Sequence, residues 1–239
     1  MSSVRWPGVA VVTGASSGIG RAIAMELACR GARLALLGRE PSRLPLGECS
    51  SQTGQQSVRG YAVDLAGGDL DRLADQIVHD FGAIDALIHC AGVFLADEGG
   101  SPADFDRMWR VNLDAPQQLT QALLDQLIQQ QREIIFINSS AALRAGAGTQ
   151  YARSKHGLKV FADGLRDEVN QFGVRVVSLF PGRTATPMQE SIHAAERREY
   201  RPAELIQASD VAQTVGFLLS LPRTVEVTEI MLRPLKKHG

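Results

Sequence analysis

The sequence has few of the features that place a protein in a membrane or outside the cell. No stretch approaches the roughly 18 uninterrupted apolar residues of a membrane helix, and residues 1–7 lack the apolar core of a signal peptide. Cysteine occurs only at Cys29, Cys49 and Cys90, an odd number without metal-ligand spacing. We therefore expect a soluble cytoplasmic protein with no membrane partner, no disulfide framework and no bound metal.

An excess of charge of one sign is also missing. The chain has 25 Lys and Arg against 26 Asp and Glu, for a net charge of −1, and no block of basic residues. Nucleic acid is therefore not expected as a partner. Apolar residues make up 44% of the 239 positions, which is enough for a real core. The length, and the absence of a linker-like segment, predict one domain over residues 1–239.

Short apolar runs alternate with segments of helical period along the chain. Strands are expected at 9–12, 34–37, 58–63, 86–89, 134–137, 174–180 and 226–232. Helices are expected at 19–30, 70–81, 112–130, 150–172 and 209–219, and the cluster at 99–102 is expected to be a loop. This alternation predicts an α/β fold with a doubly wound parallel sheet of about seven strands and helices on both faces.

A glycine-rich turn, Thr13-Gly-Ala-Ser-Ser-Gly-Ile-Gly20, joins the first strand to the first helix. Glycines allow a tight turn and a close backbone approach, and the helix that follows offers free N–H groups and a positive dipole end to a pyrophosphate. The strand–turn–helix context predicts a dinucleotide site. Its expected contacts are Gly14, Ser16, Ser17, Gly18, Ile19 and Gly20.

A second motif, Tyr151-Ala-Arg-Ser-Lys155, places a tyrosine and a lysine four residues apart on one helix face. A free phenol has a pKa near 10 and is a poor base at neutral pH, and a nearby ammonium group favours the phenolate. We expect Lys155 to lower the pKa of Tyr151. We then expect Tyr151 to act as a general acid/base near neutral pH.

Together, the spacing of the glycine-rich turn and the Tyr-x-x-x-Lys motif resemble those of the short-chain dehydrogenases/reductases. The resemblance covers nearly the whole chain. It implies a Rossmann-type fold and an oxidoreductase that transfers a hydride between a nicotinamide and a small carbonyl or alcohol substrate. The fit also leaves open a protein that binds the dinucleotide as a sensor or scaffold, without turnover.

The resemblance also implies three partners for Tyr151. A serine after the fifth strand would hold the substrate oxygen, and Ser139 fits the family frame better than Ser140, which stays an alternative. Lys155 would also hold the nicotinamide ribose. Asn112 would hold a water that links Lys155 to solvent, although the position also suits a helix N-cap.

Further cofactor contacts follow the other strands in the family pattern. They are Asp64 and Leu65 near the adenine, Ala91 and Gly92 after the fourth strand, and Pro181, Gly182, Thr184 and Thr186 near the carboxamide. His89 and Cys90 stand where the family usually has two asparagines. Both are expected to be buried core residues, with the histidine neutral and hydrogen-bonded.

The end of the second strand distinguishes NADP(H) from NAD(H), because it meets the adenosine ribose. Arg39 follows a glycine there, and a guanidinium can hold a 2′-phosphate in a forked geometry, so NADP(H) is favoured. Two alternatives stay open. Glu40 could read the ribose of NAD(H), and Arg39 could simply pair with a nearby acid.

Residues 188–207 are expected to form a lid over the substrate. Its mixed charges could select an acidic substrate, but a solvated lid face explains them more simply. The strand at 226–232 lacks the glycine-rich ending common in the family, which often helps to assemble tetramers. A homodimer, a homotetramer and a monomer all remain open.

Overall fold

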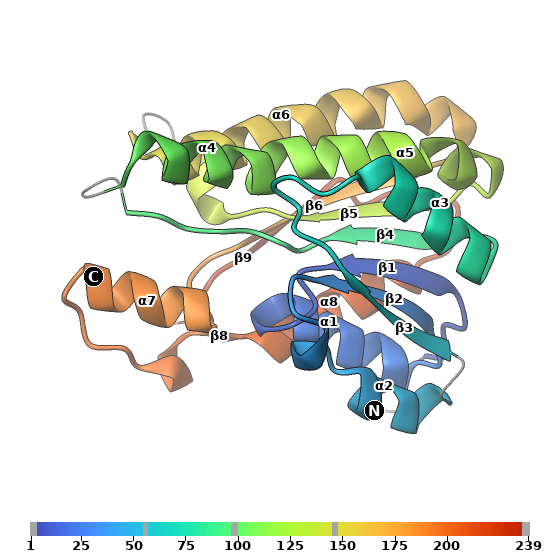
Figure 1. Cartoon of the computed structure of the whole chain (residues 1–239), viewed down its shortest axis with the longest axis horizontal. Helices are drawn as coiled ribbons and strands as arrows, with labels where there is room; N and C mark the ends of the chain where they lie inside the picture. The colour runs from blue at the N-terminus through green and yellow to red at the C-terminus, as the bar shows by residue number, and fades with distance from the viewer. Residues whose placement is uncertain (1–3, 55–56, 97–99, 145–147, 236–239) are drawn as a thin grey trace.

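The computed structural model describes residues 4–54, 57–96, 100–144 and 148–235. A seven-stranded sheet runs through the molecule in the order β3-β2-β1-β4-β5-β6-β9, and each neighbouring pair is parallel (Figure 1). The strands are β1 Val9–Thr13, β2 Arg33–Gly38, β3 Val58–Ala62, β4 Ala86–His89, β5 Glu133–Ile137, β6 Arg175–Pro181 and β9 Glu229–Leu232. The predicted sheet is therefore confirmed.

Helices cover both faces of this sheet (Figure 1). One face carries α1 Gly18–Cys29, α2 Leu46–Thr53 and α8 Ala208–Leu219. The other carries α3 Leu70–Phe81, α4 Pro102–Trp109, α5 Ala115–Gln129 and α6 Gln150–Val169. A small second sheet, β7 Thr184–Ala185 with β8 Ile206–Gln207, brackets α7 Pro187–Ala195. Within the described ranges, no helix is long and apolar enough to cross a membrane.

The central strands bury side chains on both of their faces. Every residue of β1, β5 and β6 is buried. Along β1, Val9 and Val11 join the core under α3, α5 and α6, whereas Ala10 and Val12 join the core over α1 and α8. Successive side chains of a strand point to opposite faces, so a continuous apolar run serves two cores at once.

Several elements differ from the sequence prediction. The expected loop at 99–102 ends at Ser101, whose hydroxyl accepts the N–H of Asp104 at 3.2 Å and so caps α4; Gly99 lies outside the described residues. A π-helical turn, Arg110–Asp114, then joins α4 to α5. The last strand begins at Glu229 rather than at 226.

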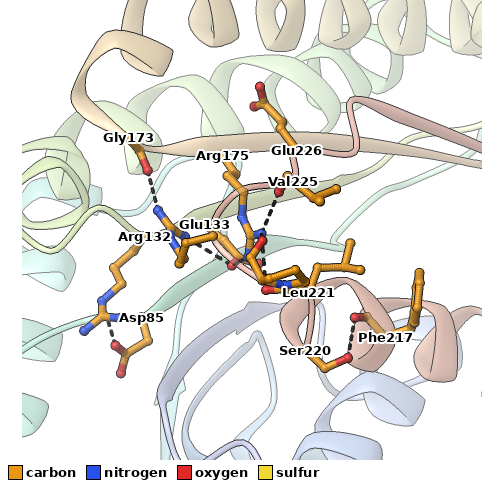
Figure 2. Close-up of polar contacts among 12 residues, drawn as sticks. Asp85, Arg132, Glu133, Gly173, Arg175, Phe217, Ser220, Leu221, Val225 and Glu226 are labelled. Atoms are coloured by element: carbon orange, nitrogen blue, oxygen red, sulfur yellow. Dashed lines mark hydrogen bonds and ion pairs between the residues drawn. The ribbon is translucent and has the colours of Figure 1, made fainter.

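A polar network occupies the amino ends of the strands, opposite the ends where ligands bind in such sheets (Figure 2). Buried Arg175, at the start of β6, pairs with buried Glu133, at the start of β5. The same guanidinium donates to the carbonyl oxygens of Leu221 at 3.4 Å and Val225 at 2.8 Å. It therefore fixes the segment that leads from α8 to β9.

Candidate active site

The turn between β1 and α1 closes only because its key positions are glycines. Gly14 and Gly18 have φ values of 67° and 52°, in the left-handed region. A Cβ on Gly20 would lie 2.3 Å from the carbonyl oxygen of Gly14, and one on Gly14 would lie 2.7 Å from the Cα of Ala91. The turn is thus packed against the end of β4 with no room for a side chain.

A cleft opens above this turn, at the carboxyl ends of β1, β2 and β4. The chain winds from β1 towards β3 on one side and towards β6 on the other, so the cleft lies at the switch point where doubly wound sheets bind ligands. Twelve of the predicted cofactor contacts line it: Gly14, Ser16, Ser17, Gly18, Ile19, Gly20, Arg39, Asp64, Leu65, Ala91, Gly92 and Thr186.

Arg39 lies exposed at the wall of this cleft, directly after β2. The alternative in which Arg39 pairs with its neighbour is not seen, because Glu40 pairs with Arg43, at 3.5 Å between Oε1 and Nη1. Within the described residues, no ion pair or side-chain hydrogen bond engages Arg39. Its guanidinium is therefore available to a ligand in the cleft.

Asp64 is engaged by a residue that the sequence analysis missed. Arg107 of α4 donates to its two carboxylate oxygens at 3.1 and 3.0 Å and lines the same cleft. The pKa of Asp64 is lowered, chiefly by the hydrogen bond from the backbone N–H of Ala66, with Arg107 and Arg39 acting in the same direction. The carboxylate stays ionised and fixed at this end of the cleft.

A second pocket adjoins the cleft and holds the predicted catalytic hydroxyls. Ser139 and Tyr151 line it together with Ser140, so the structure keeps both candidate serines beside the tyrosine. The other predicted contacts here are Pro181, Gly182, Thr184 and Thr186. Thr149 caps α6, because its hydroxyl accepts the N–H of Ala152 at 3.1 Å, and this sets Tyr151 in the first turn of the helix.

The titration of Tyr151 differs from the sequence prediction. Burial raises its pKa, and the Ser139 hydroxyl acts against that rise. Lys155 is not among the groups that shift the pKa of Tyr151, which differs from the expectation. Its Nζ donates to the carbonyl oxygen of Ile137 at 3.3 Å. Burial lowers the pKa of Lys155 itself to about 8.

Asn112 is fully buried in the π-helical turn, so it is not the N-cap that was one alternative. Its Oδ1 accepts the N–H of Val93 at 2.8 Å, and its Nδ2 donates to the Val93 carbonyl oxygen at 2.9 Å and to Ser154 Oγ at 3.1 Å. The side chain thereby fixes the backbone after β4. A Cβ on Gly92 would lie 3.5 Å from both Asn112 Oδ1 and Lys155 Nζ, so both groups pack close to Gly92.

Comparison with known proteins agrees with this geometry. Residues 8–197 match the model of the short chain dehydrogenase family. The chain belongs to that family. An uncharacterized short-chain type dehydrogenase/reductase of Sinorhizobium fredii is 34% identical over 234 residues, which cover 95% of this chain and 91% of the relative.

Two solved structures resemble this short-chain dehydrogenase over almost its whole length. An alcohol dehydrogenase from the archaeon Thermococcus sibiricus, complexed with 5-hydroxy-NADP, has a TM-score of 0.86 at 29% identity and covers 98% of this chain and 99% of its own. A metagenomic short-chain oxidoreductase in complex with NADP has a TM-score of 0.81 at 30% identity and covers 99% and 100%.

His89 ends β4, and Cys90 follows it directly. His89 is buried, stacks on Phe136 with ring centroids 4.9 Å apart, and bonds Thr120 Oγ1 through Nε2 at 2.8 Å. Burial lowers its pKa to about 3, which confirms the expected neutral core histidine. Cys90 is only half-buried and lines the dinucleotide cleft, so the expectation of a buried core residue is wrong for this position. Loss of solvent raises the pKa of its thiol to about 12, so the sulfur stays protonated near neutral pH.

Thr13 joins the end of β1 to the segment after β4. Its hydroxyl accepts the backbone N–H groups of Cys90 and Ala91, each at 3.0 Å. The ends of β1 and β4 are therefore joined beside the glycine-rich turn through the backbone of residues 90 and 91, without the side chains of His89 and Cys90.

Proposed function

We propose that this short-chain dehydrogenase is an NADP(H)-dependent oxidoreductase that interconverts a carbonyl compound and its alcohol. The observation that carries the proposal is that the pocket of Ser139 and Tyr151 shares a wall with the dinucleotide cleft. Ile19, Thr186 and Met188 line both. A substrate oxygen held by the two hydroxyls then lies next to the cofactor end of the cleft, as hydride transfer requires.

The residues present fit a nicotinamide dinucleotide. The turn from Gly14 to Gly20 has the side-chain-free backbone that a pyrophosphate needs, and Asp64 with Leu65 lines the adenine end. Lys155 is proposed to hold the nicotinamide ribose. The segment from Pro181 to Thr186 is proposed to hold the carboxamide. When bound, the nicotinamide supplies or accepts the hydride.

In the proposed reduction, Tyr151 gives its phenolic proton to the substrate oxygen while the Ser139 hydroxyl donates a hydrogen bond to the same atom. Ser139 is preferred to Ser140 because it is the hydroxyl that acts on the pKa of Tyr151. Lys155, with a pKa of about 8, can exchange protons near neutral pH and so restore the phenol. Asn112 fixes the backbone after β4 and is proposed to hold a water that links Lys155 to solvent.

Replacing Tyr151 by Phe tests this role. We expect carbonyl turnover to fall by about 100-fold or more while dinucleotide binding persists, because only the proton donor is removed. The matched control is Tyr61→Phe, since the Tyr61 hydroxyl bonds Asp80 and lies in neither pocket. Retained activity of the Tyr151 variant would contradict the acid/base role. A wild type that binds dinucleotide but turns over no carbonyl would favour the sensor or scaffold alternative.

The preference for NADP(H) is supported by the unpaired Arg39 and by the NADP ligands of the two similar structures. Fluorescence titrations with NADPH and NADH measure it directly. Because a guanidinium–phosphate bond contributes about 1.5–3 kcal/mol, Arg39→Ala should weaken NADPH binding about tenfold to 100-fold and NADH binding far less. Arg43→Ala, which frees Glu40, serves as the control. Equal losses for both cofactors would refute the assignment and return the ribose contact to Glu40.

We also propose that residues 1–239 act as one catalytic domain, with residues 188–207 as the substrate lid. The lid starts at the cofactor site, because Thr186 caps α7 by accepting the N–H of Gln189 at 3.2 Å. A cytoplasmic location and the oligomeric state stay predictions of the sequence.

A further inference from the structure

Beside the catalytic pocket lies a second hollow that collects positive charge, here called the arginine pocket. Its walls come from four parts of the chain: the segment after Ser139, the end of β6, the lid and the segment after β9. The arginines that line it are Arg144, Arg183, Arg198, Arg201 and Arg233. Such a gathering of one charge around a hollow favours anions there.

Three of these arginines have carboxylate partners that hold the lid. Arg183 pairs with Glu196 at 2.8 Å, and Arg198 approaches the same carboxylate at 3.7 Å. Arg201 pairs with Glu199 at 2.6 Å and lies 3.7 Å from Glu204. Among the residues that the structure describes, these pairs leave two of the five arginines, Arg144 and Arg233, without a carboxylate partner.

Arg144 and Arg233 differ from the three paired arginines. Neither forms an ion pair or a side-chain hydrogen bond with any residue of the described ranges. A structural role in holding the lid accounts for the paired arginines, but it does not account for these two. Both side chains are exposed towards solvent and can turn to a ligand.

Arg144 also connects the arginine pocket to the chemistry. It lines the catalytic pocket together with Ser139 and Tyr151, and it lines the arginine pocket together with Arg233. Ser140, Gly182 and Arg183 are likewise shared by the two pockets. A substrate whose carbonyl oxygen meets Ser139 and Tyr151 can therefore extend past Arg144 into the positive region.

We propose that the substrate is an oxo acid, a carbonyl compound whose anionic group, a carboxylate or phosphate, binds Arg144 and Arg233. This proposal rests on the proposed function, because it names the class of compound that the same site reduces. A guanidinium binds either anion through parallel N–H···O bonds, so the two anions share one recognition chemistry. Arg144 makes the nearer contact and Arg233 the farther one, which sets the expected order of their effects.

The test compares matched substrates that differ only in charge. NADPH consumption is followed with unbranched oxo acids of increasing chain length, their methyl esters and an oxo phosphate. We expect kcat/KM for the best acid or phosphate to exceed that of the neutral ester about tenfold, as one charge-assisted bond allows. The anion, carboxylate or phosphate, that gives the larger ratio of kcat/KM to that of the neutral ester is the group that the site prefers. Added salt should lower the ratio, because exposed charges are screened.

Variants assign the ratio to residues. Arg144→Ala should bring the acid-to-ester ratio near one, and Arg233→Ala should lower it in part. The control is Arg72→Ala, because Arg72 is exposed on α3 and lines none of the pockets described here. Equal kcat/KM for acid and ester in the wild type, or an unchanged ratio in Arg144→Ala, overturns the proposal.

Failure of the oxidoreductase function is distinguishable from failure of the anion site. If the wild type reduces neutral carbonyls as well as acids, only the anion site is lost. If the wild type reduces no carbonyl at all, calorimetric binding measurements with alkanoic acids and their methyl esters still test whether the anion site exists. Binding of the acid alone that disappears in Arg144→Ala supports the anion site, and binding that ignores Arg144 overturns it.

Discussion

Acidification should destabilise this protein through one residue, His89. The imidazole is buried, stacked on Phe136 and bonded to Thr120, and burial lowers its pKa to about 3 from 6.5. Between these two values the unfolded chain binds a proton that the folded chain refuses. The destabilising effect of His89 is therefore absent above pH 6.5. The free energy of unfolding decreases as the pH falls from 6.5 towards 3.

The size of the loss follows from the pKa difference. At pH 5 the unfolded histidine is almost fully protonated, about 1.5 pH units below its pKa, while the folded one remains neutral. Each unit corresponds to about 1.4 kcal/mol, so His89 removes about 2 kcal/mol of unfolding free energy between pH 7 and pH 5. That is a large share of the stability of an ordinary domain.

The perturbation that isolates this effect is His89→Asn. An asparagine keeps a hydrogen-bonding group near Thr120 but does not titrate. Urea unfolding followed by circular dichroism at pH 7 and pH 5 gives the loss for each protein, and the difference between proteins cancels any change in packing. The wild type should lose about 2 kcal/mol more than the variant over this interval.

The matched control is His79→Asn, at a histidine whose side chain is 87% exposed. This variant should keep the full pH dependence of the wild type. A His89→Asn protein that loses as much stability on acidification as the wild type would refute the assignment of the effect to His89.

Two further predictions concern the turn and the polar network. Gly20→Ala should weaken dinucleotide binding about tenfold or more, because the new Cβ would lie 2.3 Å from the Gly14 carbonyl oxygen and about 1.4 kcal/mol of strain is enough for a tenfold loss. Gly47→Ala is the control and should bind the dinucleotide normally, because nothing lies within 4 Å of a Cβ at that position. Equal affinities of the two variants would contradict the steric argument. Arg175→Met should lower the unfolding free energy, measured in urea, by about 3–5 kcal/mol, because buried Glu133 then keeps only the longer ion pair with Arg223, at 3.5 Å. Adding Glu133→Leu should recover much of this loss, and no recovery would contradict the charge argument.

The parts that sequence reasoning predicted are those encoded in neighbouring residues. An unbroken apolar run such as 9–12 can only be buried on both faces, so the parallel sheet followed from it. The glycine-rich turn and the spacing of Tyr151 and Lys155 are equally local. The structure places the turn and Tyr151 in adjoining pockets, whereas Lys155 is buried behind Gly92 and lines neither pocket.

What the sequence did not predict depends on contacts between distant segments. Arg107 and Asp64 are separated by 43 positions, and only the packing of α4 across the sheet brings them together. The raised pKa of Tyr151 follows from burial in the folded pocket, which no spacing rule contains. The last strand begins at Glu229 rather than at 226. The Glu226 carboxylate accepts the N–H of Val176 at 3.2 Å, where the prediction implied a backbone hydrogen bond between strands.

The ion pair of Arg175 and Glu133 lies at the amino rim of the sheet, away from the carboxyl rim where the substrate is proposed to bind. Contacts at the amino rim hold the segment that leads to β9, whereas Arg144 and the lid lie at the carboxyl rim. Segments on the carboxyl rim can therefore be exchanged with those of related proteins to change the substrate specificity. Such exchanges leave intact the ion pair that positions the last strand.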